Sequence, residues 1–137
     1  MKIIALKGRG DSGKTTTIKM LPNILIANGY KQVPNKHQKH GGDFLDIYDN
    51  GKKKVGITSS GDTFDLVNDR LSDLVAEKCD VCICACRTAD RKPPGTIAAT
   101  KNFPGYTTEY VNKTYASNPS GELKANQNDA NVLFSKI

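Results

Sequence analysis

The residues best suited to chemistry form an octapeptide near the start of the chain, residues 8–15, with the sequence GRGDSGKT. It satisfies the phosphate-binding pattern G-x-x-x-x-G-K-[ST], in which glycines let the backbone curl so that successive N–H groups point inward. Those donors, with the positive end of a following helix, can hold a chain of phosphates. We expect Lys14 to reach the β- and γ-phosphates and the Thr15 hydroxyl to ligate Mg²⁺. The residues predicted to contact the nucleotide are Gly8, Gly10, Asp11, Ser12, Gly13, Lys14, Thr15 and Thr16.

The flanking residues supply the strand and the helix that this motif requires. An apolar run directly before the first glycine predicts a strand over residues 2–7. Apolar residues at helical spacing follow the motif, so we expect a helix from about residue 13 that ends at Gly29. Pro22 removes a backbone hydrogen bond, so this helix either kinks or gives way to a second helix that starts at Pro22. A glycine-rich turn with an incidental lysine is the alternative to a phosphate site.

With this motif in this setting, the chain resembles the P-loop NTPase superfamily, which includes nucleotide kinases, ATPases and GTPases. The specific resemblance covers residues 1–30, and a looser one extends to about residue 90. It implies an α/β fold, a single three-layer P-loop domain over residues 1–137, with a mostly parallel sheet and one antiparallel hairpin. It also implies that the chain binds ATP or another NTP with Mg²⁺. The resemblance identifies a superfamily and not a reaction, because one fold hosts many activities.

Length and composition suit one globular domain. The chain has 137 residues, with 20 Lys and Arg against 14 Asp and Glu, for a formal charge of +6. A chain of this length can bury one hydrophobic core without the disulfide bonds or bound metals that smaller domains need. No segment approaches the ~20 apolar residues of a membrane span, and the short apolar run at the start is unlike a secretory signal, so we expect a cytoplasmic location and no membrane partner. Basic loops suit polyphosphate ligands and also nucleic acid, but no nucleic-acid motif accompanies the charge.

The four cysteines are close together in the sequence, at Cys79, Cys82, Cys84 and Cys86. The last three alternate with apolar residues, so in a strand they would line up along one face and would not converge on one ion. A zinc site usually takes two separated pairs of cysteines, and the sequence has no second pair. We interpret these residues as buried, reduced core thiols, with a metal site or redox chemistry as alternatives.

Turn signals and apolar patterns divide the rest of the chain. Asp49-Asn50-Gly51 lies between two β-like runs, 44–48 and 52–58, which predicts a hairpin. Residues 80–86 are apolar without alternation, as in a central strand buried on both faces. We also expect a mobile polar loop over 30–43, a helix from about 63 to 78, a loop over 87–105, a strand over 106–111, a turn at 118–121, and a last helix over 122–135 that buries Leu123, Ala130, Leu133 and Phe134.

Phosphoryl transfer also needs an acidic group that organises the metal. The hairpin, followed by a Gly/Asp turn and a helix, looks like the second and third strands and the magnesium loop of small GTPases. On that likeness Asp62 is the metal-organising candidate, although it lies four residues past the strand, and the alternative is that it only caps the helix. Asp43 is a weaker candidate for an acceptor-binding or base residue. Asp80 lies at the wrong edge, because ligands of open parallel sheets bind at the carboxyl ends of the strands.

Arg87 follows the strand over 80–86 and therefore lies at the favoured edge. Arg87, Arg91 and Lys92, on a loop bounded by Pro and Gly, resemble the lid of a small-molecule kinase, whose arginines stabilise charge on the transferring phosphoryl group. A solvated basic loop is the alternative for Arg91 and Lys92. Asn112-Lys113-Thr114-Tyr115 has Tyr where the guanine-specific N-K-x-D motif has Asp, so a preference for GTP is unsupported.

These features predict an enzyme, a P-loop kinase or NTPase, that transfers a phosphoryl group to a small acceptor or to water, with Lys14, Asp62 and Arg87 as catalytic residues and Thr15 and Asp62 as metal ligands. The alternative is a nucleotide-dependent switch or binding module that engages protein or nucleic acid through its basic loops. A P-loop protein that holds phosphate without catalysis is a third possibility.

Overall fold

The fold is that of a computed structural model that describes residues 1–90 and 92–137. In chain order its elements are β1 Lys2–Lys7, α1 Lys14–Ile18, α2 Leu21–Ala27, β2 Lys31–Gln32, β3 Gln38–His40, β4 Asp43–Asp49, β5 Lys54–Thr58, α3 Phe64–Ala76, β6 Val81–Cys86, α4 Thr96–Thr100, β7 Thr107–Asn112 and α5 Pro119–Ser135. None of the helices in this described part is long and apolar enough to cross a membrane.

All seven strands belong to one sheet with a parallel part and an antiparallel part. The order is β2-β4-β5-β6-β1-β7, and β3 also pairs with β4. β5, β6, β1 and β7 run parallel, so β1 has a parallel partner on each side. β4 runs antiparallel to β5 and continues the sheet outward to β2 and β3. The expected α/β fold, with a mostly parallel sheet and an antiparallel hairpin, is confirmed.

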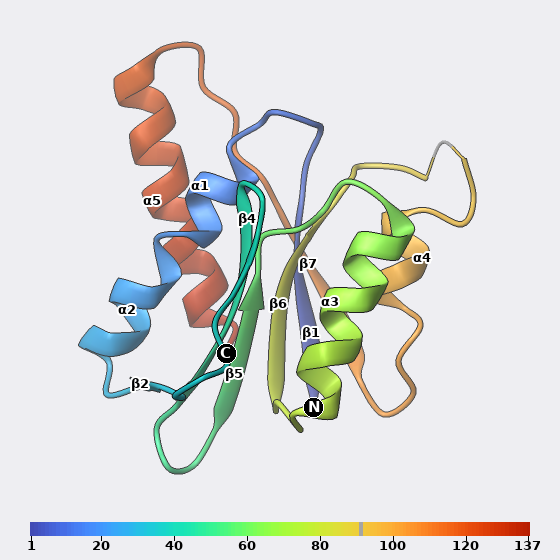
Figure 1. Ribbon diagram of the computed structural model, residues 1–137. Helices are drawn as coiled ribbons and strands as arrows, with labels where there is room; N and C mark the ends of the chain where they lie inside the picture. Colours follow the sequence, from blue (N-terminus) through green and yellow to red (C-terminus); the bar gives the residue numbers. More distant parts are fainter. Residues whose placement is uncertain (91) are drawn as a thin grey trace.

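The sheet lies between two layers of helices (Figure 1). α1, α2 and α5 cover one face, while α3 and α4 cover the other. Alternate residues of β1 feed the two cores, since Ile4 and Leu6 pack with α1, α2 and α5. Ile3 and Ala5 pack on the other face with α3 and with the cysteines of β6. The side chains of β6 are all buried, as expected of a central strand, and all four cysteines are buried free thiols.

Local signals explain most element boundaries. The helix after residue 13 divides as one alternative proposed, because α1 ends at Ile18 and Pro22 occupies the first turn of α2. A proline is tolerated there, since the first N–H groups of a helix have no partner within it. Gly29, with φ of 88°, follows the end of α2 in the left-handed conformation that glycine adopts readily.

Several expectations were wrong at polar segments. Residues 30–43 contain two short strands, β2 and β3, because the outer edge of β4 offers its backbone groups to them. The 87–105 segment contains α4. The expected turn at 118–121 is the start of α5, where the Asn118 side chain accepts from Gly121 N and Pro119 follows directly. Leu123 is 51% exposed and not part of the buried face.

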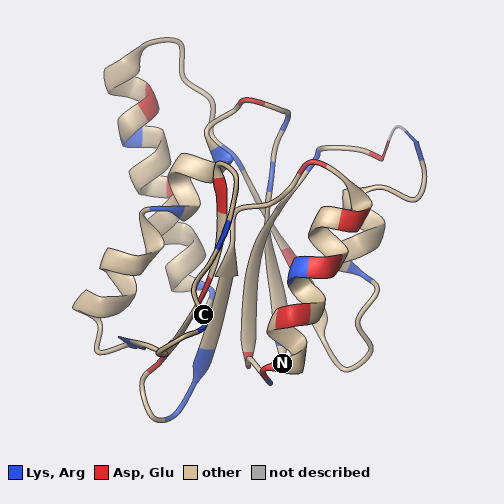
Figure 2. Cartoon of the chain, viewed as in Figure 1, with Lys and Arg blue, Asp and Glu red and all other residues tan. Residues whose placement is uncertain are grey.

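Charged residues are spread over the molecule. Figure 2 shows Lys and Arg positions on loops, strands and both helical layers, and a mainly acidic α3. Several Lys and Arg residues nevertheless lie near the carboxyl ends of the parallel strands, and they form part of the candidate site.

Candidate functional site

The 8–15 loop joins β1 to α1 at the carboxyl edge of the parallel strands (Figure 1). Its base is fixed by the sheet, since Gly8 N donates to Cys86 O at the end of β6. Asp11 and Gly13 have positive φ values of 54° and 90°, which curl the loop toward the start of α1. Beside it lies a cavity of about 480 Å³, which we call the loop cavity, lined by the loop together with Thr16, Gly42, Asp43, Ser59, Gly61 and Asp62.

Lys14 carries a nearly buried ammonium group at this cavity. Its side chain folds back over the loop, and Nζ donates to the carbonyl oxygens of Gly8 at 2.8 Å and Arg9 at 2.6 Å. Burial, and then the neighbouring Arg87 guanidinium, lower the pKa of Lys14, while the charge of Asp62 opposes them. Within the described residues Lys14 forms no ion pair. A buried cation with only neutral acceptors is well placed to take an anion.

The Thr15 hydroxyl lies beside a carboxylate that the sequence did not single out for this position. Thr15 Oγ1 donates to Asp43 Oδ1 at 3.3 Å, and Ser59 Oγ donates to the same oxygen at 2.9 Å. Asp43 is the first residue of β4, and β4 runs antiparallel to β5, so its start lies where β5 ends. The cluster therefore offers two hydroxyl groups and one carboxylate to the loop cavity.

Arg87 and Asp62 form an ion pair over the other side of the loop. Arg87 Nη2 and Asp62 Oδ1 are 3.0 Å apart, with 39% and 63% of the two side chains exposed. The guanidinium lies so close to Gly10 that a Cβ atom there would collide with it. Asp62 does not cap α3, because Thr63 is the N-cap and its side chain accepts from Leu66 N at 3.3 Å. The cap alternative for Asp62 is therefore wrong.

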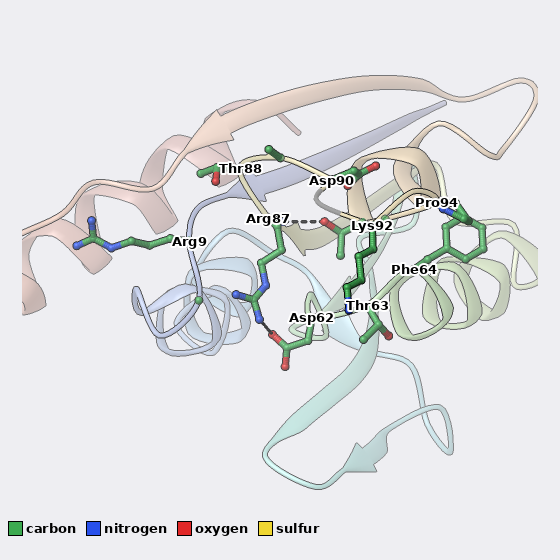
Figure 3. A pocket seen from close by; sticks show the side chains of 13 residues that line it. Arg9, Asp62, Thr63, Phe64, Arg87, Thr88, Asp90, Lys92 and Pro94 are labelled. Atoms are coloured by element: carbon green, nitrogen blue, oxygen red, sulfur yellow. Dashed lines mark hydrogen bonds and ion pairs between the residues drawn. The ribbon is translucent and has the colours of Figure 1, made fainter.

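A second cavity of about 480 Å³, which we call the side cavity, lies between the described residues of the 87–96 loop and a wall that includes Gly10, Asp62 and Phe64 (Figure 3). Arg87 N donates to Thr96 Oγ1 at 2.8 Å, which closes the base of this loop. The two oxygens of Asp90 accept from Ile97 N and Ala98 N, at 2.9 and 3.0 Å, and so fasten the loop to the first turn of α4. Lys92 lines this cavity, whereas Arg91, which was predicted to act beside it, lies outside the described residues.

On the opposite side, the residues after β7 hold the 8–15 loop through a buried network. Lys113 Nζ and Asp129 Oδ2 are 3.0 Å apart, with 1% and 3% of the two side chains exposed. Asp129 also accepts from Thr114 N and Thr114 Oγ1, both at 2.7 Å. This network positions Tyr115, whose hydroxyl accepts from Arg9 N at 3.1 Å and whose ring lies under the Arg9 guanidinium.

Comparison of the chain with protein-family models, with curated proteins and with solved structures finds no match.

The structure places those predicted site residues that it describes at this edge of the sheet, on three sides of one loop. Lys14, Thr15 and Asp62 line the loop cavity, while Arg87 borders the side cavity. Asp62 as a metal ligand stays a prediction, because in the structure its carboxylate pairs with Arg87. Sequence reasoning missed the roles of Asp90 and Asp129. The sequence holds no signal for either residue, since Gly95, and not Asp90, occupies the N-cap position of α4.

Proposed function

We propose that the chain binds a nucleoside triphosphate with Mg²⁺ at the 8–15 loop and transfers its terminal phosphoryl group to a small acceptor or to water. The observation that carries this proposal is the Lys14 ammonium. Lys14 as a residue is 7% exposed, it lines a cavity large enough for several phosphates, and its ammonium group has only two carbonyl oxygens as acceptors. A phosphate chain in the loop cavity would replace these neutral acceptors with charged ones, and charge-assisted hydrogen bonds are about twice as strong.

The donors around Thr15 fit Mg²⁺, which prefers oxygen ligands and keeps several waters when it binds with phosphates. Thr15 and Asp43 would hold the ion, with Ser59 orienting the carboxylate, and Asp62 lines the same cavity. When bound, Mg²⁺ neutralises negative charge that develops on phosphate oxygens.

Arg87 is placed to act on the group that is transferred. Its guanidinium lies over Gly10, next to Lys14, so the two cations flank one region of the loop. In transfer, an acceptor oxygen forms a bond to the terminal phosphorus, the bond from that phosphorus to the bridging oxygen breaks, and a nucleoside diphosphate leaves. Asp62, held by Arg87 and otherwise open to solvent, would take the acceptor proton.

A nucleotide-dependent switch is the second candidate, and one observation favours it. Asp43, which contacts Thr15, is separated from β3 only by Gly41 and Gly42. A change in the position of Asp43 at the proposed metal site would therefore alter the conformation of β2 and β3, which both pair with β4. Hydrogen exchange of residues 31–43 that differs between ADP and a non-hydrolysable ATP analogue, without turnover under any acceptor tested, would favour this function over catalysis.

Calorimetric titration with ATP and Mg²⁺ tests the binding step. Lys14→Ala should weaken affinity by roughly tenfold to a hundredfold, the effect expected for a charge-assisted hydrogen bond. Lys124→Ala, which removes an exposed lysine of α5, should leave affinity unchanged. Equal affinity of wild type and Lys14→Ala would contradict the proposal.

A further inference from the structure

The side cavity is distinct from the loop cavity proposed to hold the phosphates, although Asp62 lines both, and it opens beside the region that Arg87 and Lys14 flank. It begins at Gly10, passes the Arg87–Asp62 pair and continues between the start of α3 and the 87–96 loop (Figure 3). We infer that this cavity binds the phosphoryl acceptor, and that the acceptor is a small aromatic molecule with one phosphate or carboxylate group and a free hydroxyl. The inference deepens the proposed function and rests on it.

The charges around the side cavity favour an anion. Two carboxylates line it, but both are engaged, since Asp62 pairs with Arg87 and Asp90 accepts from two backbone N–H groups of α4. Lys92 forms no ion pair with any residue in the described part of the chain. In Figure 3 its side chain extends toward Thr63, between Asp62 and Phe64. A phosphate or carboxylate group in the middle of the cavity would therefore meet the Lys92 ammonium without a competing free carboxylate.

One wall of the cavity is apolar. Phe64 is partly buried in the first turn of α3, and Pro94 lies beside it on the 87–96 loop (Figure 3). A flat ring placed against these two residues would bury apolar surface and stack on the Phe64 ring, which stabilises the complex beyond the buried area alone. An aliphatic anion would contact the Lys92 ammonium but would not stack on this wall. The ammonium and the wall together therefore favour an aromatic anion.

The positions of the charged groups also fix where the reacting hydroxyl must lie. The Asp62 carboxylate and the Arg87 guanidinium separate the apolar wall from Gly10. A hydroxyl beside Asp62 would lose its proton to that carboxylate while its oxygen bonds to the terminal phosphorus, and the nucleoside diphosphate would leave from the 8–15 loop. Arg87 would then contact the transferring group and Lys92 the acceptor's own anionic group.

Phenyl phosphate is a suitable binding probe, with benzoate as the carboxylate counterpart and phenol as the neutral control. Each is titrated by calorimetry into wild type, Lys92→Ala and Phe64→Ala, and the same proteins are titrated with ATP and Mg²⁺. We expect Lys92→Ala to weaken phenyl phosphate binding by roughly tenfold and Phe64→Ala by roughly threefold to tenfold. Phenol should bind much more weakly than either anion, and the stronger of phenyl phosphate and benzoate identifies the anionic group. Two control variants remove exposed side chains near the cavity, Leu66→Ala in α3 and Lys101→Ala directly after α4. Both should bind the probes as wild type does.

A Lys14→Ala protein separates this inference from the proposed function. It should lose ATP affinity and keep phenyl phosphate affinity, whereas Lys92→Ala should do the reverse. If phenyl phosphate affinity falls with Lys14→Ala and not with Lys92→Ala, the probe binds the 8–15 loop and the inference is overturned. Absence of measurable binding by both anions also overturns it. If ATP fails to bind while the two side-cavity variants still weaken the probe, the proposed function fails and the cavity remains an aromatic-anion site.

Discussion

Asp43→Asn tests which carboxylate would organise Mg²⁺ in the proposed function. Asn has the same shape and keeps one carbonyl oxygen that can accept from both Thr15 and Ser59. Of these two bonds, the one from Ser59 at 2.9 Å is well formed, while the one from Thr15 at 3.3 Å is long. The free energy of unfolding should therefore change by less than about 1 kcal/mol, the net value of one such bond. The substitution also removes the negative charge of the Asp43 carboxylate, the kind of group through which proteins bind Mg²⁺.

If Asp43 is the metal-organising acid, Mg²⁺-dependent turnover should fall at least roughly tenfold, equivalent to about 1.4 kcal/mol in the barrier. A thermal melt and a phosphate-release assay over a range of Mg²⁺ concentrations, on the same preparation, measure both quantities. Asp62→Asn loses only an exposed ion pair, worth about 0–1 kcal/mol, so its stability should also hold. Asp69→Asn, on the exposed face of α3, is the control.

The three variants give distinct outcomes. Loss of Mg²⁺-dependent turnover in Asp43→Asn, with normal Mg²⁺ dependence in Asp62→Asn, would support the proposal that Thr15 and Asp43 hold the ion. The opposite result would refute this reasoning and restore Asp62 as the metal ligand. Wild-type turnover and Mg²⁺ dependence in both variants would remove both carboxylates from the proposed metal site.

Three further predictions concern the elements that support the site. Burial raises the pKa of Cys86 to about 11 and that of Cys84 well above its usual value, so iodoacetamide at pH 8 should label these thiols only slowly until denaturant is added, as mass spectrometry would show. Asp129→Ala leaves Lys113 buried without its partner and should cost about 3–5 kcal/mol in urea unfolding, whereas a loss below 1 kcal/mol would contradict the buried pair. Asp90→Ala frees the 87–96 loop from α4, so hydrogen exchange there should rise while exchange in β1 stays slow.

The parts of the fold that the sequence predicted are those with local signals. The apolar run before Gly8, the Asn50-Gly51 turn and the unbroken apolar residues of β6 each depend on a few adjacent residues. The start of α5 was misplaced because Asn118 and Pro119 favour a turn and a helix start equally well, and only packing decides between them.

The site divides in the same way. Lys14 and Thr15 could be predicted from one octapeptide, but Asp43 could not be paired with Thr15. The two residues are 28 positions apart, and they meet only because β4 runs antiparallel to β5. The Lys113–Asp129 pair likewise depends on the packing of α5 beside β7, and no local sequence pattern predicts that packing.

The position of β1 has a consequence for the order of events during synthesis. β1 is synthesised before its two partners, β6, which begins at residue 81, and β7, which begins at residue 107. At about 5–20 residues per second, the ribosome needs roughly 5–20 s to supply them. Until β6 is made, the apolar residues of β1 have no parallel strand to pair with, and Gly8 of the 8–15 loop lacks the Cys86 carbonyl that it donates to. A ribosome-bound chain stalled before residue 81 should therefore expose β1 to chaperones and lack the proposed nucleotide site, although it already carries the whole octapeptide.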